Sequence, residues 1–212
     1  MKEMNEAMLD GLRARVAERM SPKRFYHTAA VEHMITRLCG LYCPAHTLPM
    51  RCAALLHDVT KETGTEGQLA LCQRYGLEVT PAELLSPKTF HARTAAAMIP
   101  EEFPAFSDPM IVDAVRYHTT GRWGMSLTEK LLYLADYIDD SRTFDSCVRL
   151  REFFFSAGPE EMDMEQRMLH LNKTLLLSFD MTVKDLLEEG KIIAADTVDA
   201  RNSILLEITN AK

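Results

Sequence analysis

Histidine and aspartate side chains, which bind catalytic metal ions through nitrogen and oxygen atoms, recur along the first two thirds of the sequence. Six of them stand at expected helix ends or on expected helix faces: His27, His57, Asp58, His91, His118 and Asp136. A donor set of imidazole and carboxylate without thiolate suits iron, manganese or cobalt better than a structural zinc ion. These residue types therefore predict a catalytic site that holds transition-metal ions.

The pair His57-Asp58 carries the strongest signal. It ends the apolar segment 51–56, which we expect to be a buried helix, and a charge there is costly unless it is paired or bound to a cation. Successive helical residues point about 100° apart, so the pair can straddle one ion, or the carboxylate can bridge two. Lys61 follows one helical turn later on the same side, where its charge suits a phosphate oxygen. We predict Asp58 and Lys61 as catalytic residues.

Asp136 and His118 strengthen this interpretation. Asp136 puts a charge inside the apolar helical segment 131–135. His118 ends another expected helix, and Arg122, four residues later, can bind a phosphate through two parallel hydrogen bonds. His91 only opens an alanine-rich helix and alone predicts little. The remaining histidines are expected at the surface or hydrogen-bonded in the core: His33, His46 and His170.

The elements that position these residues are all expected to be helices. Helix starts are marked by capping residues followed by proline or by a capping-box glutamate: Ser21-Pro22, Thr80-Pro81-Ala82-Glu83, Asp108-Pro109 and Ser126-Leu127-Thr128-Glu129. After Ser126 the apolar residues follow the spacing of an amphipathic helix face. No stretch alternates as a strand does. The predicted fold class is all-α.

The chain is expected to form one main domain with helical additions. We predict an N-terminal helix in residues 1–20, a core in residues 21–158, and C-terminal helices packed on the core in residues 159–212. The last boundary follows the break Ser156-Ala157-Gly158-Pro159.

Composition excludes several classes of protein. The formal net charge of −7 argues against nucleic acid or an anionic membrane as the main partner. No apolar run approaches the roughly 18 residues of a membrane span, and the charged N-terminus has no signal-peptide core. Five cysteines indicate reduced thiols in a cytoplasmic protein. Cys39 and Cys43 have the spacing of a zinc-binding pair, but no second pair follows, so buried thiols are the preferred interpretation.

The order His…His-Asp…Asp resembles the HD superfamily of metal-dependent phosphohydrolases, an all-helical fold named for its adjacent histidine and aspartate. The resemblance places the metal-binding quartet at His27, His57, Asp58 and Asp136. His91 and His118 lie between the pair and the last aspartate, as in the HD enzymes that hold two metal ions.

A closer resemblance is to the bacterial YqeK-type family. It is carried by several motifs: Phe25-Tyr26-His27-Thr28, the segment from Ala53 to Glu62, Tyr117-His118-Thr119-Thr120-Gly121-Arg122, Ala135-Asp136-Tyr137-Ile138, and the segment from Asp196 to Asn202. Members of that family are symmetrical bis-nucleosyl tetraphosphatases, which split diadenosine tetraphosphate into two ADP and carry iron. One departure follows the last metal aspartate, Asp136, where the family has Tyr-Ile-Glu-Pro before an arginine. Here the chain has Asp139-Asp140-Ser141 before Arg142, so the proline is missing.

The resemblance implies a mechanism with two transition-metal ions, iron first and manganese or cobalt next. With Asp58 bridging them, the ions would lower the pKa of a bound water towards about 7 and so supply a hydroxide nucleophile. Cationic and hydroxyl side chains are expected to bind the phosphate chain of a dinucleoside polyphosphate or another small nucleotide: Lys61, Arg116, Thr120, Arg122 and Arg142.

Three alternatives stay open at this point. A nucleotidase or alarmone hydrolase would use the same fold and metal site on guanosine tetraphosphate or a mononucleotide. A nucleotide-sensing module would keep the site without turnover. A nucleic-acid phosphodiesterase is disfavoured by the acidic balance. The sequence leaves open whether the chain forms a homodimer.

Overall fold

Local capping interactions begin the helices where the sequence predicts them. In this computed structural model, which describes residues 4–211, the Ser21 hydroxyl accepts a hydrogen bond from the Arg24 amide at 3.2 Å. Asp108 caps the next predicted start in the same way, and Ser126 and Glu129 form a complete capping box. Each such cap stabilises its helix by about 1 kcal/mol. The box at Thr80 opens a helix of only four residues.

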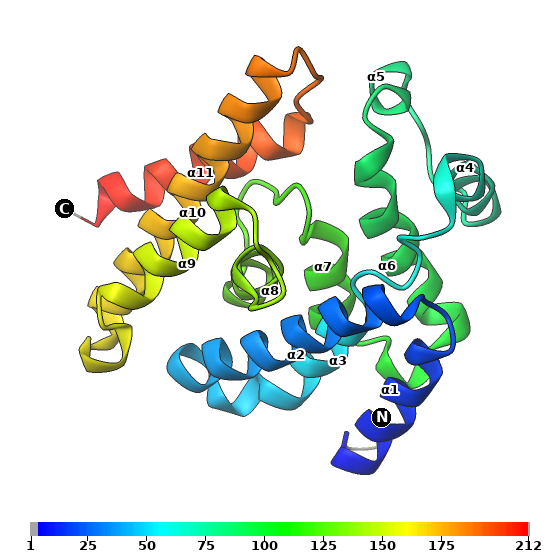
Figure 1. The fold of residues 1–212 in the computed structure, drawn as a ribbon, viewed down its shortest axis with the longest axis horizontal. Coiled ribbons are helices and arrows are strands. Elements are labelled where there is room, and N and C mark those ends of the chain that lie inside the picture. Colours follow the sequence, from blue (N-terminus) through cyan, green and yellow to red (C-terminus); the bar gives the residue numbers. More distant parts are fainter. Residues whose placement is uncertain (1–3, 212) are drawn as a thin grey trace.

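The chain folds into helices joined by short turns (Figure 1). The α-helices are α1 (Glu6–Ala17), α2 (Pro22–Tyr42), α3 (Thr47–Leu56), α4 (Gly64–Arg74), α5 (Pro81–Leu84), α6 (Phe90–Glu102), α7 (Pro109–Tyr117), α8 (Leu127–Ile138), α9 (Asp145–Ser156), α10 (Met164–Glu188) and α11 (Ala195–Asn210). Short 3-10 helices occupy Pro44–His46, Pro87–Thr89, Pro104–Phe106 and Pro159–Glu161. Residues 4–211 contain no strand, which confirms the all-α prediction.

The core lies where α2, α3, α7 and α8 pack on one another. Helix α3 is central, and its residues from Cys52 to Leu56 are all buried. It ends at Leu56, and the turn that follows begins with His57 and Asp58. The apolar segment therefore carries these two polar residues to the interior end of a buried helix, which determines where the chemistry sits.

Helices α10 and α11 pack along each other, and α9 joins them to α8. In Figure 1 this C-terminal group and the group α4–α6 lie on opposite sides of α7 and α8. A buried lysine fastens the C-terminal group, because Lys130 of α8 donates to Asn172 of α10 at 3.1 Å and to Glu207 of α11 at 2.5 Å. The packing agrees with helices laid on a core, while the division at residues 20 and 158 stays a prediction.

Gly121 shows why the turn between α7 and α8 needs a glycine. Its φ is +66°, and a Cβ there would lie 2.7 Å from the Ala200 Cβ and 2.9 Å from the Phe179 ring. No other residue fits both this backbone and this space. Gly121 thus lets α10 and α11 approach the turn that follows His118.

The structure shows the state of the cysteines and the character of the described helices. All five cysteines are free thiols, and Cys39 is buried while Cys43 is half-buried on the next turn. Within residues 4–211, the groups of side chains able to hold a metal ion include no cysteine. Of the helices described, none is long and apolar enough to cross a membrane.

Candidate metal centre

The structure brings together all six residues predicted as metal ligands. They come from α2, from the turn after α3, from the first turn of α6, from the turn after α7 and from α8: His27, His57, Asp58, His91, His118 and Asp136. Five are buried, and Asp136 is half-buried. Elements separated by more than a hundred residues thus converge on one polar cluster inside an apolar core.

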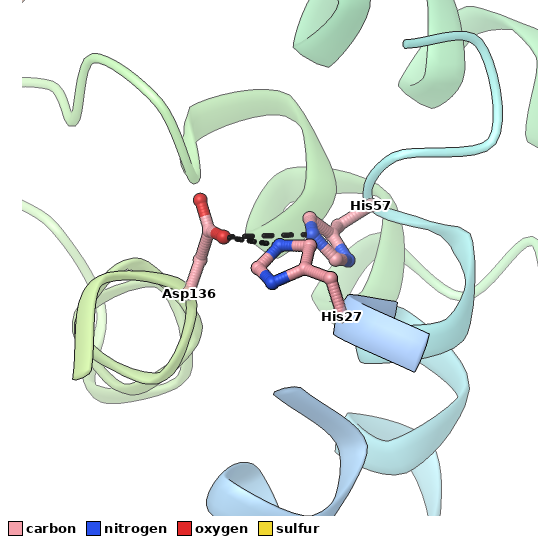
Figure 2. A group of neighbouring side chains, drawn as sticks. All are labelled: His27, His57 and Asp136. Atoms are coloured by element: carbon pink, nitrogen blue, oxygen red, sulfur yellow. Dashed lines mark ion pairs between the residues drawn. The ribbon is translucent and has the colours of Figure 1, made fainter. Parts of the chain in front are cut away.

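One part of the cluster, called here the His27 half, consists of His27, His57 and Asp136 (Figure 2). The Oδ1 atom of Asp136 lies 3.0 Å from Nε2 of His27 and 3.7 Å from Nε2 of His57. In Figure 2 both imidazole rings face the carboxylate from the other side of a small space. Two nitrogens and one oxygen that converge within 4.8 Å of one another are a suitable donor set for one ion.

The other part, called here the His91 half, consists of His91 and His118, whose Nε2 atoms are 3.0 Å apart. Asp58 lies between the two halves. Its Oδ1 atom is 3.2 Å from Nε2 of His91 and 3.8 Å from Nε2 of His118, while its Oδ2 atom is 3.5 Å from Nε2 of His57. The two carboxylate oxygens therefore face different histidines, as a bridging ligand requires.

Backbone carbonyls fix the orientation of three histidine rings. His57 Nδ1 lies 2.6 Å from the Ala54 carbonyl oxygen, His91 Nδ1 lies 2.7 Å from that of Lys88, and His118 Nδ1 lies 2.7 Å from that of Val115. In each case the carbonyl belongs to the residue three positions earlier. A carbonyl only accepts, so Nδ1 carries the proton and Nε2 keeps its lone pair. All three rings thus present a metal-binding nitrogen to the cluster.

The histidines of the cluster differ in charge. Burial lowers the pKa of His57 to about 4 and that of His91 to about 4, with nearby Asp58 opposing the change only in part. Burial also acts on His27, but hydrogen bonds to Asp136 and Asp139 outweigh it and raise the pKa of His27 to about 9. Without an ion at neutral pH, His57 and His91 are neutral whereas His27 is protonated.

The two carboxylates stay ionised at the bottom of the site. Burial by itself would raise the pKa of Asp58, but His57, His118, His91 and Lys61 hold that pKa well below its usual range. Arg142 and His27 do the same for the pKa of Asp136. Two permanent negative charges in a buried site favour a cation between them.

Unpaired atoms test whether a metal ion fits. Nε2 of His57 and Oδ1 of Asp58 are buried and have no hydrogen-bond partner within residues 4–211. Buried polar atoms without a partner are rare because each costs free energy. These atoms face one another across the cluster, so the residues present fit a bound transition-metal ion.

Lys61 and two arginines surround the cluster. Lys61 Nζ lies 2.9 Å from Nε2 of His91 and 3.7 Å from Oδ1 of Asp58, and burial lowers the pKa of its ammonium group. Arg142 donates to Oδ1 of Asp136 at 2.5 Å and to the Asp136 carbonyl at 2.9 Å. Arg24 donates to Oδ2 of Asp58 at 2.8 Å. The three cations give the rim of an acidic site the charge that a phosphate chain requires.

The other three predicted substrate contacts lie away from the cluster: two line a separate cavity, and the third pairs with a glutamate. Arg116 and Thr120 line a cavity of about 370 Å³ that reaches the start of α11. Arg122 donates to Glu129 at 2.5 Å and stacks over the ring of Tyr117. The structure therefore does not show Arg122 contacting the cluster, and its predicted role in substrate binding stays a prediction.

Four residues that were not predicted as part of the site contact the cluster: Arg24, Thr119, Asp139 and Ser141. Ser141 Oγ lies 3.0 Å from Nδ1 of His27, and Asp139 Oδ2 lies 3.4 Å from the same nitrogen. Thr119 Oγ1 lies 3.1 Å from Nε2 of both His91 and His118. For Arg24 a signal existed, because it precedes His27 by three positions on one helix and so shares its face.

Comparisons with known proteins agree with this geometry. Residues 24–140 match the HD domain family, a range that contains all six clustered residues. Three bacterial proteins named symmetrical bis(5'-nucleosyl)-tetraphosphatase are similar to this chain. That of Bacillus subtilis is 31% identical, covering 86% of this chain and 89% of its own. Those of Staphylococcus aureus and Halalkalibacterium halodurans are 28% and 29% identical, covering 87% and 91% of this chain and 88% and 94% of theirs.

A solved structure extends the agreement to the fold. The crystal structure of a predicted HD superfamily hydrolase involved in NAD metabolism, from Clostridium acetobutylicum, is similar with a TM-score of 0.81 and 30% sequence identity. The match covers 93% of this chain and 97% of that one. Both the helical core and the C-terminal helices therefore have counterparts in that protein.

Proposed function

The chain belongs to the HD domain family, and from that premise we propose that it hydrolyses dinucleoside tetraphosphates symmetrically, converting diadenosine tetraphosphate into two ADP. The three similar proteins, which match this chain over most of both lengths, are named for this activity. The observation that carries the proposal is the buried cluster of histidines and carboxylates, in which Nε2 of His57 and Oδ1 of Asp58 have no hydrogen-bond partner within the described residues. Such a site suits metal-dependent attack on a phosphate anhydride.

The cluster has donors for two ions. One ion would be held by His27, His57 and Asp136, and the other by His91 and His118. Asp58 would contact both ions, because its two carboxylate oxygens face different histidines. Iron is the proposed metal, with manganese or cobalt as substitutes, because the donors are nitrogen and oxygen only. A bound transition-metal ion supplies an activated water near neutral pH and polarises a phosphoryl oxygen.

The protein side chains around the ions have separate tasks. Lys61, beside His91 and Asp58, would neutralise phosphate oxygens on the His91 half. Arg24 and Arg142 hold the carboxylates of Asp58 and Asp136 in place while leaving their own charge at the rim. Hydrolysis adds one water across the central P–O–P bridge, and both products are ADP.

Product analysis tests the proposal. Iron- or manganese-loaded protein is incubated with diadenosine tetraphosphate beside an Asp58→Ala control. ADP as sole product, absent from the control, is the expected result, whereas AMP plus ATP would contradict symmetrical cleavage. A mononucleotide, guanosine tetraphosphate and single-stranded RNA serve as competing substrates. Faster turnover of one of them would favour a nucleotidase, an alarmone hydrolase or a phosphodiesterase, and no turnover at all would favour a sensor.

A further inference from the structure

Cavities adjoin the metal centre on two sides. One, of about 560 Å³, is lined by His27 and Arg142 beside Lys23, Arg24, Tyr26 and Phe144. On the other side, Lys61 and His91 line a cavity of about 170 Å³, and Thr119 lines one of about 460 Å³. A symmetrical dinucleotide has a nucleoside at each end of its phosphate chain. Cleavage at its centre requires room for a nucleoside diphosphate on both sides of the ions.

The cavity beside His27 has two aromatic rings in its lining. Tyr26 is 69% exposed and Phe144 is 67% exposed, so a ligand can reach both rings from solvent. Tyr26 precedes His27 on α2, and Phe144 is the residue before α9, so different elements bring the rings to one cavity. Within residues 4–211, neither ring packs against another aromatic ring.

Cations line the same cavity as the two rings. Lys23 is exposed, and Arg24 and Arg142 carry their charge next to Asp58 and Asp136. The acidic residue of the cavity, Glu62, accepts hydrogen bonds from the Ser21 amide and hydroxyl, both at 2.7 Å. Aromatic faces bind bases by stacking, and arginine and lysine bind phosphates. The lining of this one cavity therefore combines two aromatic rings, three cations and the metal-ligand candidate His27.

We propose that this cavity binds one nucleoside diphosphate half of the substrate, with its base stacked on Tyr26 and Phe144. The other half lies towards Lys61 and Thr119. This inference rests on the proposed function, and it adds a subsite that distinguishes dinucleotides from substrates with a single nucleoside. Stacking engages the face of a base and not its edge, so the subsite accepts adenine and guanine alike.

The test compares steady-state kinetics of the metal-loaded protein and its variants with diadenosine tetraphosphate. The double variant Tyr26→Ala with Phe144→Ala raises KM about tenfold or more, since stacking on each base contributes substantially to binding, while kcat changes much less. Tyr26→Trp in the otherwise unchanged chain keeps a low KM because the larger ring also stacks. Phe153→Ala removes a partly exposed ring on α9 outside this cavity and serves as the matched control.

The outcomes separate the subsite from the activity. An unchanged KM in the double variant, or an equal rise in the Phe153→Ala control, overturns the subsite. Another outcome is a dimeric wild type and a monomeric double variant with the same KM as the wild type. In that case the rings form a contact between copies and the proposal is wrong. If the wild-type protein does not cleave diadenosine tetraphosphate, the proposed function fails, and equilibrium dialysis with ADP then decides about the subsite. Equal ADP affinity of the wild type and the double variant overturns it.

Discussion

The two halves of the metal centre use the same residue types in different ways. In the His27 half, Nε2 of His57 lacks a hydrogen-bond partner within the described chain, and Nε2 of His27 lies 3.0 Å from Oδ1 of Asp136. In the His91 half, Nε2 of His91 already contacts His118, Thr119 and Lys61 at 2.9–3.1 Å. An ion in the His27 half would displace a proton from His27 and nothing from His57, whereas an ion in the His91 half would displace the contacts of His91 with Thr119 and Lys61.

The two halves also differ in their donors, since three side chains converge in the His27 half and two in the His91 half. His27, His57 and Asp136 are carried by α2, α3 and α8, which pack on one another in the core. His91 and His118 lie at the start of α6 and after α7, next to cavities that Lys61 and Thr119 line. We expect two ions of unequal affinity, with the tighter one in the His27 half.

The largest expected effect comes from removing the residue that both halves share. Asp58→Ala should lower kcat/KM for diadenosine tetraphosphate at least about a thousandfold, because both ions lose a ligand and Arg24 is left beside an uncompensated site. Metal content measured after gel filtration should fall for both ions. A variant that folds normally by circular dichroism and still holds two ions would contradict a bridging role for Asp58.

Single histidine variants test the two halves of the metal centre separately. His27→Ala should release the tighter ion and lower activity about a hundredfold, whereas His91→Ala should leave one ion bound per chain. Metal-to-protein ratios and activity measured on both variants check this. His33→Ala, which removes an exposed histidine from the same helix α2, is the control. Retention of one ion by His27→Ala and of none by His91→Ala would reverse the assignment.

The pH dependence of metal binding sharpens the same contrast. The pKa of His27 is raised to about 9, so below that pH an ion must displace a proton from this ring, while His57 and His91, each with a pKa of about 4, bind without releasing one. The affinity of the His27 half should therefore rise about tenfold per pH unit between pH 7 and 9. The affinity of the His91 half should change little.

Titration calorimetry in buffers of different ionisation enthalpy measures the released protons. About one proton per ion at pH 7.5 is expected for the tighter site. Zero protons released there would show that His27 is already neutral, and the electrostatic difference between the halves would then be wrong.

The smallest expected effect concerns the support of Asp136. Arg142 holds both the carboxylate and the backbone carbonyl of Asp136, and lysine keeps the charge but not the paired donors. Arg142→Lys should lower kcat/KM roughly fivefold with metal content unchanged. Arg142→Met, which also removes the charge, should have the larger effect. Equal activity of the two variants would mean that the charge of Arg142 contributes nothing.

Local chemistry determined much of this protein from the sequence alone. Caps at Ser21, Asp108 and Ser126 begin helices where predicted, since capping depends on residues within one turn. A carboxylate inside an apolar helical segment marked Asp136, and the pair after a buried segment marked His57-Asp58, because burying a charge is costly wherever it happens. The fold class and the membership of the six residues in one cluster followed from these signals and from the family resemblance.

The division of the six residues into two halves, and the side chains that surround each half, depend on the tertiary structure. Which oxygen of Asp58 faces which histidine depends on how α3 meets α2, α6 and α7, and the pairing of Arg24 with Asp58 crosses from one helix to another. Arg122 contacts Glu129 instead of the cluster, although its sequence position next to His118 indicated otherwise. Tyr26 and Phe144 meet at one cavity although 117 positions separate them in the sequence. These contacts join segments far apart in the sequence, so they depend on how the helices pack and cannot be predicted from a local sequence pattern.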